Sequence, residues 1–146
     1  MKNENAPTIL PDDEKTQVLG AVVHLMREAG FSDGFFSPEE QAAFQSELDS
    51  MELSVFKDIS HEHMEAILRR IDVDIKKLGL EPVTRKALGT LKDKALQERV
   101  FAAALHIARA GGKVVPEELK YLKRLKEKFH FSDAQVEALV KKTVSA

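Results

Sequence analysis

Signals for the start and end of helices recur along this chain and leave little room for other secondary structure. Residues 37–40 read Ser-Pro-Glu-Glu, which combines a capping serine, a proline at the first helical position and a glutamate three residues after the cap. Ser132 and Gln135 form a second capping box. No run of residues alternates long enough between apolar and polar to form a strand. The sequence predicts an all-α fold, with about seven helices in a single compact bundle.

Glycine, proline and capping residues divide the chain into the expected helices. These helices are predicted to begin near residues 11, 37, 60, 82, 93, 116 and 132. The helix capped by Ser60 has two interpretations, because it either continues to Gly79 or bends near Asp72. Residues 1–10 are expected to be a flexible lead-in, and residues 11–146 a single helical domain.

Two segments of the chain repeat one pattern. Residues 24–30 and 106–112 share the order His, aliphatic, any residue, Arg and end in glycine. The Ser-Pro-Glu-Glu at 37–40 then parallels Val-Pro-Glu-Glu at 115–118. Each half is therefore a predicted helix, glycine-containing loop and proline-started helix. The bundle is predicted to consist of two pseudo-symmetric halves.

His24 and His106 occupy equivalent positions in this repeat, each within an apolar helix. A histidine in such a helix is more often a structural residue with one hydrogen bond than a metal ligand. We predict that both are structural histidines of the core or of an interface. We further predict that they pair with each other across a pseudo-twofold axis.

The loop that follows the first repeated helix has part of the pattern of a calcium-binding loop. Asp33, Gly34 and Glu40 match its last positions, but the first and third ligand positions hold alanine and phenylalanine, which lack a side-chain oxygen. A complete calcium loop is therefore excluded. A weaker divalent-ion site that uses Asp33, Glu39 or Glu40 stays open.

The alternative interpretation of these loops is structural. Gly34 and Gly112 would then supply the turns, because glycine adopts positive φ without strain. Phe36 would fill the core, and Glu40 and Glu118 would cap the helices that follow. We favour this interpretation over a metal site.

The repeated order of apolar helix, glycine loop, second helix and serine-capped turn resembles the TerB-like tellurite-resistance family. Residues 100–140 carry the resemblance best, and residues 21–44 look like the partner copy. The resemblance implies an all-helical, cytoplasmic domain without catalysis that serves tellurite and other stress responses. It also implies association with divalent metal and with partner proteins near the membrane. The second loop has Gly111 where the family usually has an acidic residue.

Charge is distributed unevenly, although the net charge is only −2. Residues 1–65 hold 4 basic and 14 acidic residues, whereas residues 85–130 hold 12 basic and 5 acidic residues. Such asymmetry indicates an electrostatic surface for a partner. The helix expected from residue 116 has a basic face that consists of Lys120, Arg124 and Lys128 at four-residue spacing, with Lys123 beside them.

We predict that these four cations form a basic face for a protein partner. The alternatives are a solvated helix face, a surface for nucleic acid or anionic lipid, and a contact between copies of the chain. Nucleic acid and membranes are the less favoured partners, because the chain is not basic overall and only 6% of its residues are aromatic.

Composition and motifs also exclude several classes of function. The chain has no cysteine, which excludes disulfides, thiolate catalysis and iron–sulfur clusters. The residues around His61 resemble a metalloprotease motif, but Glu65 stands where the second histidine is required. The first ten residues, with one lysine and no continuous apolar run, do not read as a signal peptide, and we expect no membrane span, because no apolar run is long enough. We predict a cytoplasmic, non-catalytic binding protein, for which a divalent cation is the one cofactor left open.

Overall fold

The structure is a computed structural model that describes residues 14–31, 36–52, 54, 56–112 and 114–145. These residues form seven α-helices and no strand, which confirms the all-α prediction. The helices are α1 (Glu14–Phe31), α2 (Pro38–Glu52), α3 (His61–Leu78), α4 (Leu80–Thr90), α5 (Lys94–Ala110), α6 (Pro116–Lys128) and α7 (Asp133–Ser145). The expected lead-in at residues 1–10 lies outside the described residues. In the described part of the chain, no helix has the length and apolarity to cross a membrane.

The junction of α3 and α4 is a sharp corner made by one glycine. α3 runs through Asp72 to Leu78 without interruption, which decides between the two interpretations of this region. Gly79 has a φ of 89°, a conformation that favours glycine. α4 begins at Leu80, so the predicted start at Pro82 is two residues late. Pro82 lies in the first turn, where a backbone N–H has no partner within the helix.

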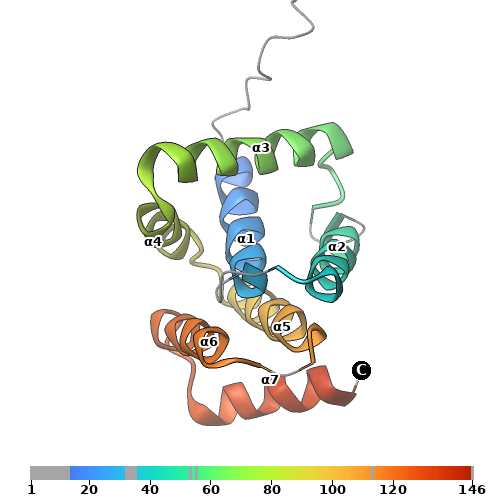
Figure 1. Cartoon of the computed structure of the whole chain (residues 1–146), viewed down its shortest axis with the longest axis vertical. Helices are drawn as coiled ribbons and strands as arrows, with labels where there is room; N and C mark the ends of the chain where they lie inside the picture. Colours follow the sequence, from blue (N-terminus) through green and yellow to red (C-terminus); the bar gives the residue numbers. More distant parts are fainter. Residues whose placement is uncertain (1–13, 32–35, 53, 55, 113, 146) are drawn as a thin grey trace, which may run out of the picture.

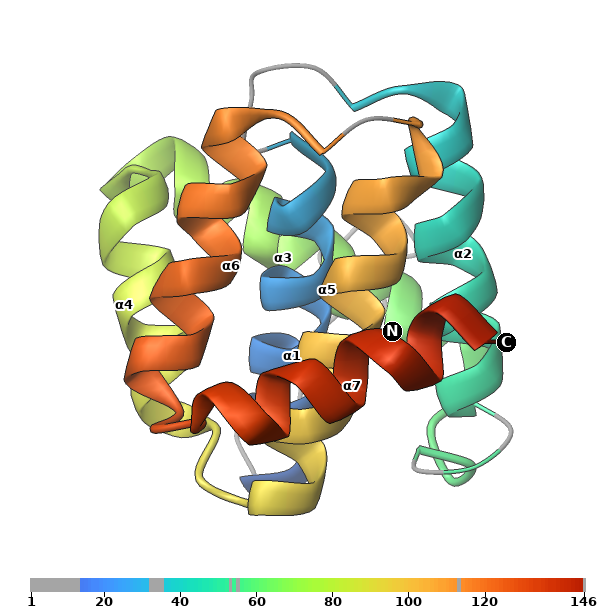
Figure 2. The ribbon, with the colours of Figure 1, turned by 90° about the horizontal axis from the view of Figure 1, so that it is seen from below.

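The two most apolar helices, α1 and α5, pack against each other in the middle of the bundle (Figures 1 and 2). α4 lies on one side of this pair and α2 on the other, while α3 packs across α1 and α7 packs across α5. Leu25 of α1 and Ile107 of α5 are both completely buried. The apolar character of both helices on most of their sides agrees with this central position.

The division of the bundle into pseudo-symmetric halves stays a prediction. α1–α2 and α5–α6 both follow the order helix, turn, helix. The two units differ in what comes next, because the pair α3–α4 follows α2, whereas α7 alone follows α6 in the described residues. The pair α3–α4 packs against α1, so the first unit has neighbouring helices that differ from those of the second unit.

Candidate functional site

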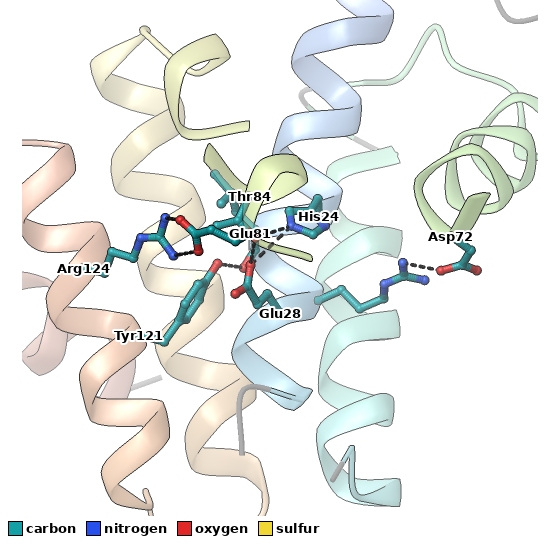
Figure 3. A network of polar contacts seen from close by, with 9 residues as sticks. His24, Glu28, Asp72, Glu81, Thr84, Tyr121 and Arg124 are labelled. Carbon is teal, nitrogen blue, oxygen red and sulfur yellow. Dashed lines mark hydrogen bonds and ion pairs between the residues drawn. The ribbon is translucent and has the colours of Figure 1, made fainter. Parts of the chain in front are cut away.

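The predicted basic face lies on α6, and the structure divides its four cations into two groups. Lys120, Lys123 and Lys128 are exposed and have no ion-pair partner among the described residues. Arg124 is bound by Glu81 of α4 through two hydrogen bonds, of 2.9 Å from Nη1 and 2.5 Å from Nη2 (Figure 3). The three lysines are therefore the cations that remain for a partner.

The pair Arg124–Glu81 joins α6 to the start of α4. Its hydrogen bonds lower the pKa of Glu81 below the ordinary value of 4.5 and raise the pKa of Arg124. The side chains are 32% and 53% exposed, so water and salt screen their attraction. Such a pair contributes at most about 1 kcal/mol to stability.

An exposed leucine lies among the lysines of α6. Leu119 is 57% exposed and precedes Lys123 by one turn of the helix. Glu117 and Glu127 are also exposed on α6 and dilute its positive charge. A nucleic-acid backbone requires concentrated positive charge. Mixed charge around an apolar side chain therefore suits a protein surface better.

The opposite face of α6 is buried against α1 and α5. Tyr121 is 6% exposed, and its hydroxyl donates a hydrogen bond of 2.6 Å to the backbone oxygen of Leu25. Burial, and then the nearby Glu28 carboxylate, raise the pKa of Tyr121 well above its ordinary value of 10.0. The phenol is therefore protonated at neutral pH and serves as a hydrogen-bond donor that fixes α6 on α1.

A buried polar cluster lies between α1 and α4, close to Tyr121 (Figure 3). It consists of His24, Glu28 and Thr84, which are 1%, 6% and 0% exposed. The Thr84 hydroxyl donates a hydrogen bond of 2.6 Å to Glu28 Oε1. His24 Nε2 lies 2.9 Å from Thr84 Oγ1 and 3.3 Å from Glu28 Oε1. Thr84 of α4 therefore contacts both α1 residues of the cluster, and His24 and Glu28 also contact each other across one turn of α1.

The cluster also assigns the proton on the His24 ring. Thr84 has one hydroxyl proton, which goes to Glu28, so the Thr84 oxygen accepts and His24 Nε2 donates. In a neutral imidazole the other nitrogen, Nδ1, is then an acceptor. Nδ1 is buried and has no hydrogen-bond partner in the described part of the chain.

His24 could be singled out from the sequence, but its partners were missed there. Glu28 follows His24 by four residues on an apolar helix, which places both on one face. Thr84 shares a helix face with Leu88 and Leu91, at spacings of four and seven residues. The signal that could have identified Glu28 and Thr84 is that each polar residue occupies a position where the helical spacing predicts a buried apolar residue.

His106 has different surroundings, although it occupies the same position in the repeat. Its side chain is 48% exposed, and its Nδ1 lies 3.7 Å from Glu47 Oε2 of α2. Neither histidine hydrogen-bonds to the other, so the predicted pairing of His24 with His106 is wrong. The physical reason is that α4 covers His24, whereas the side chain of His106 reaches solvent beside α2.

The corner between α1 and α2 contains the candidate metal ligands. Asp33 and Gly34 lie outside the described residues, and Glu39 is exposed. Glu40 is 4% exposed; its Oε1 accepts a hydrogen bond of 2.9 Å from the Ser37 backbone N–H, and Ser37 Oγ accepts one of 3.1 Å from the Glu40 N–H. Among the described residues, no three His, Asp or Glu side chains are placed to hold a metal ion. Ser37 and Glu40 thus form a helix cap, and the predicted divalent-ion site stays a prediction.

The corner between α5 and α6 has one of the two hydrogen bonds that form the cap at Ser37 and Glu40. The Val115 N–H donates a hydrogen bond of 3.0 Å to Glu118 Oε1, but valine has no side-chain oxygen that could accept one in return. Gly112 has a φ of 104°, which suits a turn glycine. A Cβ atom on Gly111 would lie 3.5 Å from the carboxyl carbon of Glu40. The two corners are therefore neighbours in space, each with a buried glutamate that caps a helix.

Comparison with protein families identifies one match. A family model described as Tellurite resistance protein TerB matches residues 19–141. The match begins in α1 and ends in α7, so it includes both corners and the α6 face. Comparisons with the curated proteins and with the solved structures gave no match.

Proposed function

Because this chain belongs to the TerB tellurite-resistance family, we propose that it is a non-catalytic, cytoplasmic stress-response module that acts by binding an acidic protein partner. The observation that carries this proposal is the outer face of α6. Lys120, Lys123 and Lys128 are exposed there without an ion-pair partner among the described residues, next to the exposed Leu119. Unpaired cations around an apolar side chain match an acidic protein surface.

The way in which α6 is held supports this role. Tyr121 attaches the inner face of the helix to α1, and the Arg124–Glu81 pair links the helix to α4. The lysines therefore project from a helix whose position is fixed before a partner arrives. Such preorganisation lowers the entropy that is lost on binding.

The experiment compares two triple charge reversals. The first replaces Lys120, Lys123 and Lys128 by glutamate, and the control replaces three other exposed lysines on α3 and before α5: Lys76, Lys77 and Lys92. Both variants change the net charge equally. We expect acidic proteins to co-purify with the wild type and the control at low salt and to be lost from the α6 variant. Tellurite tolerance of the host cells should fall in the same variant.

Two results would contradict the proposal. If the α6 variant retains the same partners as the wild type, the face is a solvated helix surface. If the wild type binds DNA or anionic vesicles in a salt-dependent way, and the α6 variant does not, the alternative function predicted from the sequence replaces this one.

The contribution of a divalent ion stays a prediction, and the proposed binding function does not depend on it. A thermal-shift measurement with calcium, magnesium, manganese and zinc on chelator-stripped protein tests it. A shift that disappears in Asp33→Ala and Glu39→Ala would establish an ion site in the first corner. Glu40→Ala is less informative, because it also removes the cap on Ser37.

A further inference from the structure

The corner between α3 and α4 has most of the exposed large apolar side chains in the described part of the chain. Leu78, the last residue of α3, is 62% exposed, and Leu80, the first residue of α4, is 37% exposed. Val73 of α3 is also exposed and lies five residues before Leu78. Single exposed apolar residues are common on proteins, whereas several at one place are typical of a contact surface.

The position of this corner explains why its leucines are not covered. Gly79 turns the chain between the two helices, and Figure 1 shows the turn at the outer edge of the bundle, on the side away from α2. Each helix already packs other apolar residues into the core, among them Ile71 of α3 and Leu88 of α4. Leu78 and Leu80 therefore remain at the surface as a projecting apolar pair.

Two lysines lie directly beside this apolar pair. Lys76 and Lys77 are exposed in the last turn of α3 and have no ion-pair partner among the described residues. The three acidic residues within seven positions of Gly79 each have a basic partner: Asp72 with Arg27, Asp74 with Arg70, and Glu81 with Arg124. The corner therefore presents two unpaired ammonium groups next to exposed leucines, and the acidic residues near it in the sequence are already paired.

The shape of the corner favours a soft anionic surface as its partner. The two leucines project from a turn, and neither lines the cavity that lies between α1, α3 and α4. A projecting apolar pair enters the headgroup region of a bilayer, which deforms around it. Lysine side chains beside it reach the lipid phosphates through their flexible stems. Anionic lipids attract such cations near the membrane surface.

We propose that the α3–α4 corner binds the surface of an anionic phospholipid bilayer. Leu78 and Leu80 insert at the level of the headgroups, while Lys76 and Lys77 bind the lipid phosphates. Two leucines and two lysines give weak, reversible binding. This surface uses none of the α6 lysines, so the proposal goes beyond binding of an acidic protein partner and does not depend on it.

The test measures binding of the full chain to two kinds of vesicle by co-sedimentation. One kind contains equal amounts of phosphatidylglycerol and phosphatidylethanolamine, and the other contains phosphatidylcholine only. We expect binding to the anionic vesicles at low salt, at least tenfold weaker binding to the neutral ones, and loss of binding as the salt concentration rises.

The apolar contact is tested by a pair of variants that remove exposed leucines from different helices. Leu78→Ser combined with Leu80→Ser should weaken binding to the anionic vesicles about tenfold, because the inserted apolar surface is lost. Leu119→Ser is the control, because Leu119 is the exposed leucine of α6 and should leave vesicle binding unchanged. Circular dichroism and thermal unfolding check that each variant is folded.

The charge contact is tested by two double variants with the same net charge. Lys76→Gln with Lys77→Gln should weaken binding to the anionic vesicles about tenfold. Lys120→Gln with Lys123→Gln removes two exposed lysines of α6 and should leave vesicle binding unchanged. The same α6 variant should lose acidic protein partners, so the two surfaces are separated by one set of proteins.

Several results would overturn the proposal. Absence of binding to the anionic vesicles by the wild type at low salt would do so without any variant. Full binding by the folded variant that lacks Leu78 and Leu80 would show that the corner does not insert. Equal losses from the α3 and α6 lysine variants would show attraction by overall charge. If no vesicle binds and the leucine variant loses an acidic protein partner, the corner is a protein interface.

Discussion

The segment that contains His24 and the segment that contains His106 follow one sequence pattern and end in different environments. His24 is 1% exposed and belongs to a polar cluster under α4, whereas the His106 side chain is 48% exposed beside Glu47. The difference arises because α3 and α4 pack on α1. A repeated sequence pattern thus sets the local helix and turn, while burial depends on which other helices pack against it.

The largest contrast is expected from removal of each histidine. His24→Ala removes a buried partner of Thr84 and Glu28 and opens a cavity, so it should lower the free energy of unfolding by about 3 kcal/mol. His106→Ala should cost less than about 0.5 kcal/mol, because that side chain is half exposed. Urea denaturation followed by circular dichroism at pH 7 measures both values. Equal losses would show that the buried cluster contributes nothing specific.

The glycines that end the two repeated helices should differ by a smaller amount. A Cβ atom on Gly30 would lie 2.2 Å from a ring carbon of Phe36, which packs edge-on against Phe44. Gly30→Ala should therefore cost about 2 kcal/mol through overpacking. Gly112→Ala meets no neighbour and should cost only about 1 kcal/mol, from its φ of 104°.

Gly20→Ala is the matched control for Gly30→Ala. It is also a glycine of α1, but its Cβ atom would contact Ile67 at 3.9 Å without a clash. Alanine is the better helix former, so this variant should gain up to about 1 kcal/mol. Thermal unfolding of the glycine variants gives the order, and destabilisation by Gly20→Ala would mean that the space beside Ile67 does not accept an added carbon.

One substitution in each corner tests the helix caps: the first should lower the stability of the protein and the second should raise it. Ser37→Ala removes the hydroxyl that accepts from the Glu40 N–H and should cost about 1 kcal/mol. Val115→Ser supplies the missing oxygen in the second corner and should gain about 0.5 kcal/mol. Denaturant midpoints measure both. A loss from Val115→Ser would show that the packing of the valine outweighs a cap.

The smallest effect is expected at the contact that holds α4 over His24. Arg124 lowers the pKa of Glu81 in the folded protein, so the pair stabilises above the ordinary value of 4.5 and this contribution is lost as the pH falls below it. Glu81→Gln should cost less than about 1 kcal/mol at pH 7. The difference from the wild type should shrink in high salt and vanish in acid. A difference that persists at pH 2 would exclude the ion pair as its cause.

Particular residues show how far sequence reasoning reached. The capping serines, Gly112 and the spacing of apolar residues predicted seven helices and nearly all of their starts, because these signals act within one or two turns. The α6 lysines were also visible, since residues four apart share a helix face. The capture of Arg124 by Glu81 was not visible, because 43 residues separate them in the chain.

The sequence by itself determined the helices, the turns between them and the charge on each helix face, because hydrogen bonds and sterics between near neighbours decide these. The tertiary structure decided which equivalent histidine is buried, which cation is neutralised and which leucines stay exposed. Those outcomes depend on the packing of α3 and α4 against α1, which brings together residues such as His24 and Thr84 that lie 60 positions apart.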